Sequence, residues 1–400
     1  MYDVIVVGAR AAGAPAAMLL ARAGYRVLML ERARFPKDTL STLYIHQPGV
    51  AQLDRWGVLP DVVNTGAPAL DNVRYTIDDI RLEGCSWPAD GNAASYAPRR
   101  YLLDSILAQA AVDAGVEFRD NCSVNDLVWE DDRVVGVRIG SIRGGGQTVE
   151  RARLVIGADG MRSTVAAKVE APLVIEDPSL TCAYYTYWSG LPQQFRLFEA
   201  PGRWVGTVPT NDGATLVAGY FPQSEFGTVR GDALNALLDC VAQTAPEVRE
   251  QMAGGSRLER VHGTGDQRNF FRQAAGPGWA LIGDAGHHKD SITARGITDG
   301  FFQSQLLADC IGDSLQDPDR LEAALESFAI QRTEALMPYY RSTLKTGRLS
   351  APAHQLDMLR AISTSPELTS RYFSTMSGVC PVDEFLTPEL LELMADQVAA

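Results

Sequence analysis

Residues 2–32 read YDVIVVGARAAGAPAAMLLARAGYRVLMLER and decide the fold of this 400-residue chain. The apolar run 4–7 predicts a strand that is buried on both faces. Gly8 and Gly13 enclose a tight turn, and alanines and leucines then recur at helical spacing. A second apolar run predicts a strand that ends at Glu31. The order of strand, glycine turn, helix, strand and acid indicates a dinucleotide-binding βαβ unit.

The chemistry of a dinucleotide explains these residues. A pyrophosphate needs backbone N–H groups and the positive end of a helix dipole. A carboxylate at Glu31 can accept hydrogen bonds from both hydroxyls of a ribose, which favours FAD or NAD over NADP. Arg10 stands where the motif usually has its middle glycine. This arginine either restricts the approach of the phosphates or faces one of them, and a plain buried βαβ unit remains the alternative reading of the whole stretch.

Composition and charge exclude several classes of protein. The net charge of −13 and the absence of a basic run argue against nucleic acid or an anionic membrane as the main partner. No apolar run reaches the length of about 18–20 residues that a transmembrane helix needs. The six cysteines are scattered without a C-x-x-C pair, so we expect free thiols and a cytoplasmic location. The chain begins directly with a strand, so we expect no signal peptide, and no metal site is predicted.

The remaining pattern is that of an interrupted layout. Buried strands are expected again at 154–157 and 279–283, whereas short alternating and aromatic segments between them are typical of antiparallel sheets. We predict a parallel-sheet cofactor domain that comprises residues 1–71, 98–178 and 266–345. A mainly β substrate domain is inserted into it as residues 72–97 and 179–265. Residues 346–400 are expected to form a helical C-terminal region.

Individual elements are also predicted. Periodicity and turn residues indicate short strands, a hairpin and several helices. The expected strands are 73–75, 80–82 and 95–97, and the expected hairpin joins 134–139 to 148–153 around the glycines at 144–146. The expected helices are 48–56, 100–111, 231–245, 296 to about 315, 320 to about 340, and one that starts at Thr387.

Three separated motifs together identify a family resemblance. The first is the βαβ unit, the second is Gly-Ala-Asp-Gly-Met-Arg-Ser at 157–163, and the third is Gly-Asp-Ala-Gly-His-His at 283–288. Each is weak alone, but in this order the chain resembles the flavin monooxygenases of the para-hydroxybenzoate hydroxylase type. The resemblance covers roughly residues 1–345 in layout. It implies an α/β fold with a Rossmann-like, glutathione-reductase-like FAD-binding domain, an inserted mainly β substrate domain and a helical tail.

The resemblance also implies which residues hold FAD. Those in the first motif would bind the ADP half, Arg100 would meet the flavin phosphates, and Asp284 would bind the ribityl chain. Asp159 matches a motif associated with both FAD and a passing nicotinamide cofactor. The expected FAD-binding set is Gly8, Ala12, Gly13, Glu31, Arg32, Arg100, Val124, Asp159, Gly283, Asp284, Gly296 and Ile297.

The chain departs from the family pattern at a few positions. Besides Arg10, Lys168 stands where the second motif often ends in arginine, and Ser291 stands about where the family has a proline beside the flavin. The segment 38–42 is similar to the corresponding loop of the related halogenase and geranylgeranyl reductase branches. These departures affect the expected fine geometry rather than the expectation of FAD binding.

The resemblance implies oxygenation of a hydrophobic, aromatic or polyketide-like small molecule with NADPH or NADH and O2, through a flavin C4a-hydroperoxide. Such a species must be shielded from water. The aromatic cluster within 184–220 is a candidate pocket, although the same residues also suit a sheet core. No catalytic residue is identified by the sequence, and the candidates for the substrate pocket are Thr42, His46, His288 and Arg295.

Other functions remain open. One is a flavin-dependent reductase of an isoprenoid or polyketide double bond, and another is a flavin-binding partner without catalysis. A halogenase is disfavoured because none of the six tryptophans lies two residues from another, so the Trp-x-Trp-x-Ile-Pro pattern is absent. The sequence does not decide whether a nicotinamide reduces the flavin directly or a separate flavin reductase supplies it.

Overall fold

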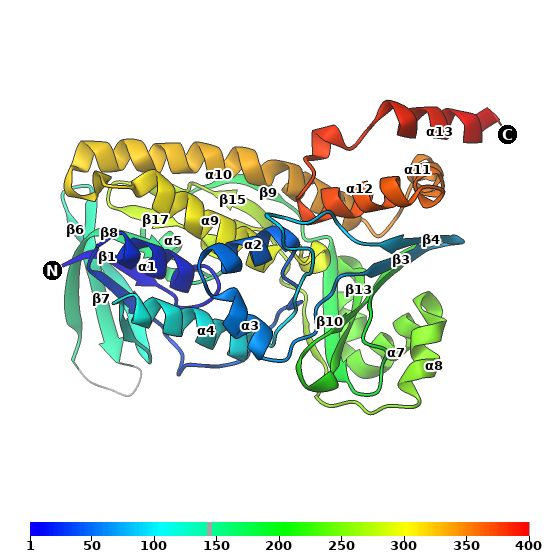
Figure 1. Ribbon diagram of the computed structural model, residues 1–400. Coiled ribbons are helices and arrows are strands. Elements are labelled where there is room, and N and C mark those ends of the chain that lie inside the picture. The colour runs from blue at the N-terminus through cyan, green and yellow to red at the C-terminus, as the bar shows by residue number, and fades with distance from the viewer. Residues whose placement is uncertain (142–145, 400) are drawn as a thin grey trace.

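The computed structural model describes residues 1–141 and 146–399. Within these residues the chain forms an eight-stranded sheet, a seven-stranded sheet and a three-stranded sheet, here called sheets A, B and C. Sheet A and the helices around it form one side of the molecule, and sheet B forms the other (Figure 1). The C-terminal helices lie over β3 (Val73–Ile77) and β4 (Ile80–Gly84) of sheet B (Figure 1).

Sheet A contains the predicted βαβ unit. Its main order is β16-β17-β8-β1-β2-β5, in which β17, β8, β1, β2 and β5 run parallel. The strands β6, β7 and β8 form an antiparallel ladder beside it. The bounds are β1 Tyr2–Val7, β2 Val27–Leu30, β5 Glu117–Arg119, β6 Cys122–Glu130, β7 Arg133–Ser141, β8 Thr148–Gly157, β16 Ala275–Gly276 and β17 Trp279–Leu281.

Strand β1 is buried on both faces, as the sequence predicted. Val4 and Val6 pack in the core beneath helices α1 (Gly13–Arg22), α4 (Arg100–Asp113) and α9 (Gly296–Ile311). Ile5 and Val7 face the opposite core, which β6, β7 and the short helix α5 (Thr164–Lys168) cover. This double burial explains why the strand is an unbroken apolar run.

Sheet B unites two segments that are distant in the sequence. Its order is β14-β10-β13-β12-β11-β3-β4, antiparallel except for the pair β11 and β3. The bounds are β3 Val73–Ile77, β4 Ile80–Gly84, β10 Thr181–Trp188, β11 Phe195–Ala200, β12 Arg203–Pro209, β13 Thr215–Pro222 and β14 His262–Thr264. The small sheet C consists of β9 Leu173–Asp177, β15 Asn269–Arg272 and β18 His287–His288.

Helices cover both faces of sheet B. One face packs against α7 (Ala233–Thr244) and α8 (Pro246–Met252). The other face packs against α11 (Ala353–Ser363) and α12 (Pro366–Ser377). The long helix α10 runs beside α9 and reaches from sheet A toward α12 (Figure 1). The other helices are α2 Gln47–Arg55, α3 Leu59–Asn64, α6 Phe226–Gly231, α10 Pro318–Thr346 and α13 Pro388–Ala399, and short 3₁₀ turns include η3 Gly283–Ala285 and η4 Ser291–Thr293.

Most predicted elements are confirmed, and one is wrong. Residues 95–97 form no strand, because Ser95 bridges to Leu70 while Tyr96 bridges to Ile45, and two single bridges to different segments make no ladder. The helix from 320 continues to Thr346 rather than ending near 340.

Two further expectations concern the hairpin and the last helix. Strands β7 and β8 pair as the predicted hairpin, and its turn at 144–145 lies outside the described residues. Thr387 caps α13, because its Oγ1 accepts a hydrogen bond from Leu390 N at 3.2 Å. The helices of the described ranges include none with the length and apolar character that would cross a membrane.

Candidate active site

The turn between β1 and α1 packs directly against the end of β8. Gly8 has φ +107°, and a Cβ there would lie 2.3 Å from the carbonyl oxygen of Ala158. A Cβ at Gly13 would lie 1.8 Å from the carbonyl oxygen of Gly8. Both positions therefore require glycine, and Gly13 is the first residue of α1, at whose N-terminus a phosphate group is bound most favourably.

Glu31 lies at the end of β2, beside this turn. Its carboxylate is buried and accepts hydrogen bonds from Ala9 N at 3.3 Å and Ala33 N at 2.9 Å. These bonds fix its position next to the first turn of the motif. Arg32 follows on the surface, and Val124 lies in the core of β6 on the far side of sheet A.

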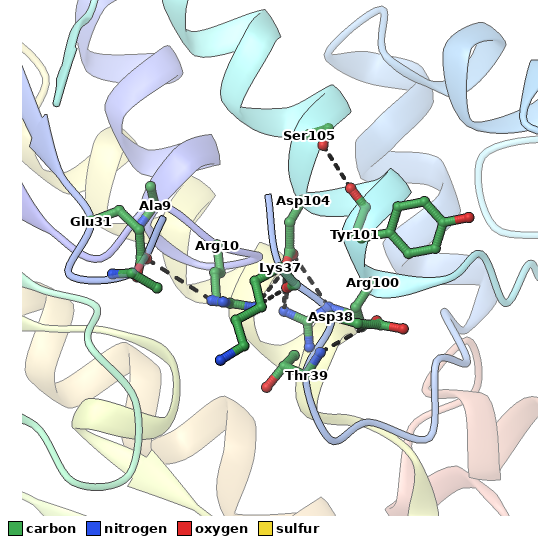
Figure 2. A network of polar contacts seen from close by, with 11 residues as sticks. Ala9, Arg10, Glu31, Lys37, Asp38, Thr39, Arg100, Tyr101, Asp104 and Ser105 are labelled. Carbon is green, nitrogen blue, oxygen red and sulfur yellow. Dashed lines mark hydrogen bonds and ion pairs between the residues drawn. The ribbon is translucent and has the colours of Figure 1, made fainter. Parts of the chain in front are cut away.

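Arg10 connects the turn to helix α4. Figure 2 shows its guanidinium between Glu31 on one side and Asp104 on the other. Arg10 Nη1 donates to Asp104 Oδ2 at 3.2 Å and to the carbonyl of Lys37 at 3.0 Å, while its Nε lies 3.9 Å from Glu31 Oε2. The side chain therefore lies along the edge of the turn instead of filling it.

Asp104 is the centre of this polar network. It is fully buried, and Arg100 donates to its Oδ1 from Nη2 at 2.9 Å and from Nε at 3.2 Å. Burial raises the pKa of Asp104, and the guanidiniums of Arg100 and Arg10 act against that shift. Two arginine side chains are thereby held beside the glycine turn, where they add positive charge to the helix dipole of α1.

The carboxylate of Asp159 is hydrogen-bonded to residues that follow it closely in the sequence. Its carboxylate accepts from Ser163 Oγ at 2.5 Å and from the N–H groups of Thr164 at 2.6 Å and Val165 at 3.3 Å. These bonds satisfy the first N–H groups of α5. Burial raises the pKa of Asp159, and Gly160 follows with φ +81°.

The third motif meets the first at the start of α9. A Cβ at Gly283 would lie 2.8 Å from Ala12 Cβ, and Ser304 of α9 donates to the carbonyl of Ala12 at 2.7 Å. Asp284 is exposed, and Gly296 is the exposed first residue of α9 with open space around its Cβ position. Ile297 beside it is buried in the core. The first turns of α9 and the segment that carries the exposed carboxylate of Asp284 thus pack against the glycine turn.

A cavity of about 880 Å³, measured out to open solvent, lies between these motifs and sheet B. Alternate residues of three strands form its floor, as expected for side chains on one face of a sheet. From sheet B come Phe195, Leu197, Trp204, Val208, Leu216 and Tyr220. From the cofactor side come Thr42, Tyr44, His46, Ile292, Thr293 and Ala294.

Polar groups are few in this cavity, and two of them belong to one aromatic stack. Tyr44 stacks on Phe195 with ring centroids 4.5 Å apart and meets the edge of His46 at 4.8 Å. His46 Nε2 lies 3.1 Å from the carbonyl of Thr293, so Nε2 carries the proton of the neutral ring. Burial lowers the pKa of His46 to about 3 and raises that of Tyr44 to about 12. Both side chains are therefore uncharged at neutral pH.

Comparison with known proteins identifies the family. The family model described as "FAD binding domain" matches residues 1–300. The chain belongs to this FAD-binding family. The protein is accordingly an FAD-dependent oxidoreductase.

Related proteins of this FAD-binding family carry different activities. A digeranylgeranylglycerophospholipid reductase of Methanocella arvoryzae is 28% identical and covers 84% of this chain and 83% of its own. A 6-methylpretetramide 4-monooxygenase of Streptomyces rimosus is 27% identical, covering 87% and 86% respectively. The solved structure of a flavoprotein/dehydrogenase from Cytophaga hutchinsonii has the same fold, with a TM-score of 0.83, 19% identity and 99% coverage of both chains.

The residues at the junction of the three motifs fit FAD. Glycine is sterically required where the backbone turns toward a pyrophosphate, and Glu31 is fixed at the end of β2. The start of α9 and Asp284 are exposed on the cofactor side of the cavity. Phosphate, ribose and flavin groups would each find a partner of suitable chemistry there.

The structure brings some of the predicted substrate residues together and leaves others apart. Thr42 and His46 line the cavity. His288 does not, because it belongs to β18, where its Nδ1 contacts the carbonyl of Arg268. Arg295 does not line it either, since its buried guanidinium is bound to carbonyls of the C-terminal region.

Sequence reasoning found part of the cavity in the aromatic cluster within 184–220 and missed other lining residues, such as Tyr44 and Phe373. Of the aromatic cluster, Phe195, Trp204 and Tyr220 line the cavity, whereas Tyr184 and Phe198 lie on the opposite face of sheet B. The alternation of strand residues could have separated the two faces. The walls contributed by α12 carried no recognisable signal, because nothing in that helix's sequence tells which surface it covers.

Proposed function

We propose that this protein is an FAD-dependent monooxygenase of the para-hydroxybenzoate hydroxylase type that uses NADPH or NADH and O2. Its substrate would be a hydrophobic small molecule, aromatic or polyketide-like. The relatives named as monooxygenases of 6-methylpretetramide and of kynurenine support a reaction on an aromatic compound. Residues 72–97 and 179–265, which supply sheet B, would form the substrate domain, and residues 1–71, 98–178 and 266–345 the FAD-binding domain.

One observation carries the proposal: the apolar cavity ends at the residues that lead into α9. Thr293 and Ala294 form part of its wall, and Gly296 begins the helix only two residues later. A ligand on the floor of sheet B would therefore lie beside the end of the cofactor site at which the third motif gathers. Such a largely apolar, aromatic site suits a reaction that water would spoil.

The chain's own residues would bind, orient and shield. Bound FAD would supply the activation of O2, and the protein supplies position and polarity. Phe195, Trp204 and Tyr44 would hold a flat ring by stacking and exclude water. His46 is a weak base with a pKa of about 3, so its unprotonated Nδ1 would accept a hydrogen bond from a substrate hydroxyl rather than remove its proton.

Residues of the three motifs would hold FAD. Gly8, Ala12 and Gly13 would face the pyrophosphate, and Glu31 would accept from the adenosine ribose. Arg32 would border the adenosine end, Val124 would contribute there through its backbone because its side chain is buried in the core, and Arg100 would meet the flavin phosphates. Asp284, with Gly283, would bind the ribityl chain, and Gly296 with Ile297 would direct the start of α9 at the flavin. Asp159 would serve beside the path of the nicotinamide.

Labelled oxygen tests this function. The purified protein is loaded with FAD and given NADPH or NADH, ¹⁸O2 and a panel of phenols, anthranilates and polycyclic aromatic compounds. One ¹⁸O atom in the product supports the monooxygenase. Nicotinamide oxidation that yields only peroxide across the panel contradicts it, and turnover that requires an added flavin reductase would show that reduced flavin is supplied by a partner.

A reductase is the second candidate function. Several relatives named digeranylgeranylglycerophospholipid reductases are 24–28% identical over 80–87% of this chain, and the apolar cavity also suits an isoprenoid. In that case the same protein, supplied with dithionite under anaerobic conditions, would saturate an isoprenoid double bond. Hydrogen addition without O2, together with no oxygenated product, would establish this alternative.

A further inference from the structure

Helix α12 forms one wall of the cavity. Phe373, Met376 and Ser377 line it from the last turns of the helix. Helix α12 also packs on α11 and β4, so it covers the face of sheet B on which the cavity lies. Its C-terminal end is therefore the part of the helix that closes the space where a ligand would lie.

Polar contacts concentrate at this same end. Ser374 Oγ accepts from Trp87 N at 2.8 Å, and Ser377 Oγ lies 2.8 Å from Ser86 Oγ. Arg295 adds two contacts from the cofactor side, donating from Nη1 to the carbonyl of Ser377 at 2.8 Å and to that of Met376 at 3.1 Å. The last carbonyls of a helix lack partners within it and carry its negative dipole end, which is why a guanidinium suits them.

The guanidinium of Arg295 is also held by residues outside α12. It lies over the ring of Tyr339 of α10, 3.8 Å from the ring centroid, and its Nε is 3.3 Å from Asp299 Oδ1. Asp299 is also paired with the buried Lys289. Arg295 immediately precedes Gly296, so one side chain joins the start of α9 to the end of α12.

Gly378 provides the room for this contact. It follows α12 with φ +90°, in the left-handed conformation that often ends a helix, and a Cβ there would lie 3.0 Å from both Nη atoms of Arg295. Arg295 is only 7% exposed, and its Nη1 donates to two carbonyls of the protein. The guanidinium thus lies outside the lining of the cavity, for which the sequence had made Arg295 a candidate.

We propose that Arg295 is a positioning residue that latches α12 as a lid over the cavity and ties the lid to the first turn of α9. The lid is closed while the guanidinium holds the carbonyls of Met376 and Ser377, and loss of this contact frees the end of α12. The inference rests on the proposed function only in taking the cavity as the substrate site.

Thiol labelling tests the latch without any turnover. Cys380 lies just beyond α12, after Gly378 and Val379, and is 1% exposed, whereas Cys240 lies in α7 on the opposite face of sheet B and is 2% exposed. The purified protein, with its bound FAD, is treated with iodoacetamide, and the rate at each cysteine is read by peptide mass spectrometry. In Arg295→Met, which keeps Lys289 paired with Asp299, we expect Cys380 to react roughly tenfold faster and Cys240 to be unchanged.

Control variants separate the latch from general destabilisation. Arg320→Met removes an exposed guanidinium of α10 and should leave both rates unchanged. Arg295→Lys, which keeps a cation near the carbonyls, should restore most of the slow labelling of Cys380. An unchanged Cys380 rate in Arg295→Met, or an equal rise at Cys240, overturns the latch. Neither result depends on oxygenation, so the latch and the proposed function fail separately.

Discussion

Replacing Arg10 by methionine should destabilise the protein less than the same replacement of Arg100, because Asp104 depends on the two guanidiniums unequally (Figure 2). Arg100 gives Asp104 Oδ1 two hydrogen bonds in a buried setting, while Arg10 gives a single 3.2 Å bond from a side chain that is 24% exposed. Breaking a buried ion pair costs about 3–5 kcal/mol. A charged hydrogen bond contributes about 1.5–3 kcal/mol, less where solvent screens it.

We therefore expect the free energy of unfolding of the apoprotein to fall by about 3–5 kcal/mol in Arg100→Met and by about 1–2 kcal/mol in Arg10→Met. Urea unfolding measures both values. The dissociation constant of FAD, followed by flavin fluorescence, should rise less than about tenfold in Arg10→Met, which corresponds to about 1.4 kcal/mol. It should rise further in Arg100→Met if Arg100 meets the flavin phosphates.

Two results would refute this reasoning. Equal losses of stability in the two variants would show that Asp104 relies on both arginines alike. A rise in the FAD dissociation constant well beyond tenfold in Arg10→Met would make Arg10 a phosphate ligand, the other reading of its place in the glycine motif.

Two further predictions concern the turn and the buried histidine. Gly13→Ala should abolish FAD binding, because its Cβ would lie 1.8 Å from the carbonyl of Gly8, whereas Gly227→Ala, with open space around it, should bind FAD normally in the same fluorescence titration. Burial lowers the pKa of His46 to about 3. Below pH ~6.5 this histidine therefore binds a proton in the unfolded chain, whereas it stays neutral in the folded protein. The free energy of unfolding should therefore fall by up to about 1.4 kcal/mol per pH unit from pH ~6.5 toward 3. The urea midpoints at pH 7 and pH 5 should differ less in His46→Gln than in the unmodified protein. Parallel pH profiles of the two proteins would contradict this assignment.

The sequence alone determined the cofactor half of the molecule. Strand β1, the glycine turn, helix α1 and Glu31 follow each other within some thirty residues, and each is specified by a local constraint: burial on both faces, absence of a Cβ, helical spacing, and a carboxylate at a strand end. The motifs at Asp159 and Asp284 are likewise short segments that are specified by local constraints. Their order along the chain was sufficient to predict the FAD-binding family and the fold.

Only the tertiary structure decided what surrounds the cavity. The partners of Arg295 lie more than 80 positions away, in a helix whose own sequence is merely amphipathic. Which aromatic residues of sheet B face the cavity depends on strand register and on which helices cover each face. A side chain's identity and neighbours in sequence fix its local conformation, but contacts between distant segments arise from packing, and packing is a property of the whole chain.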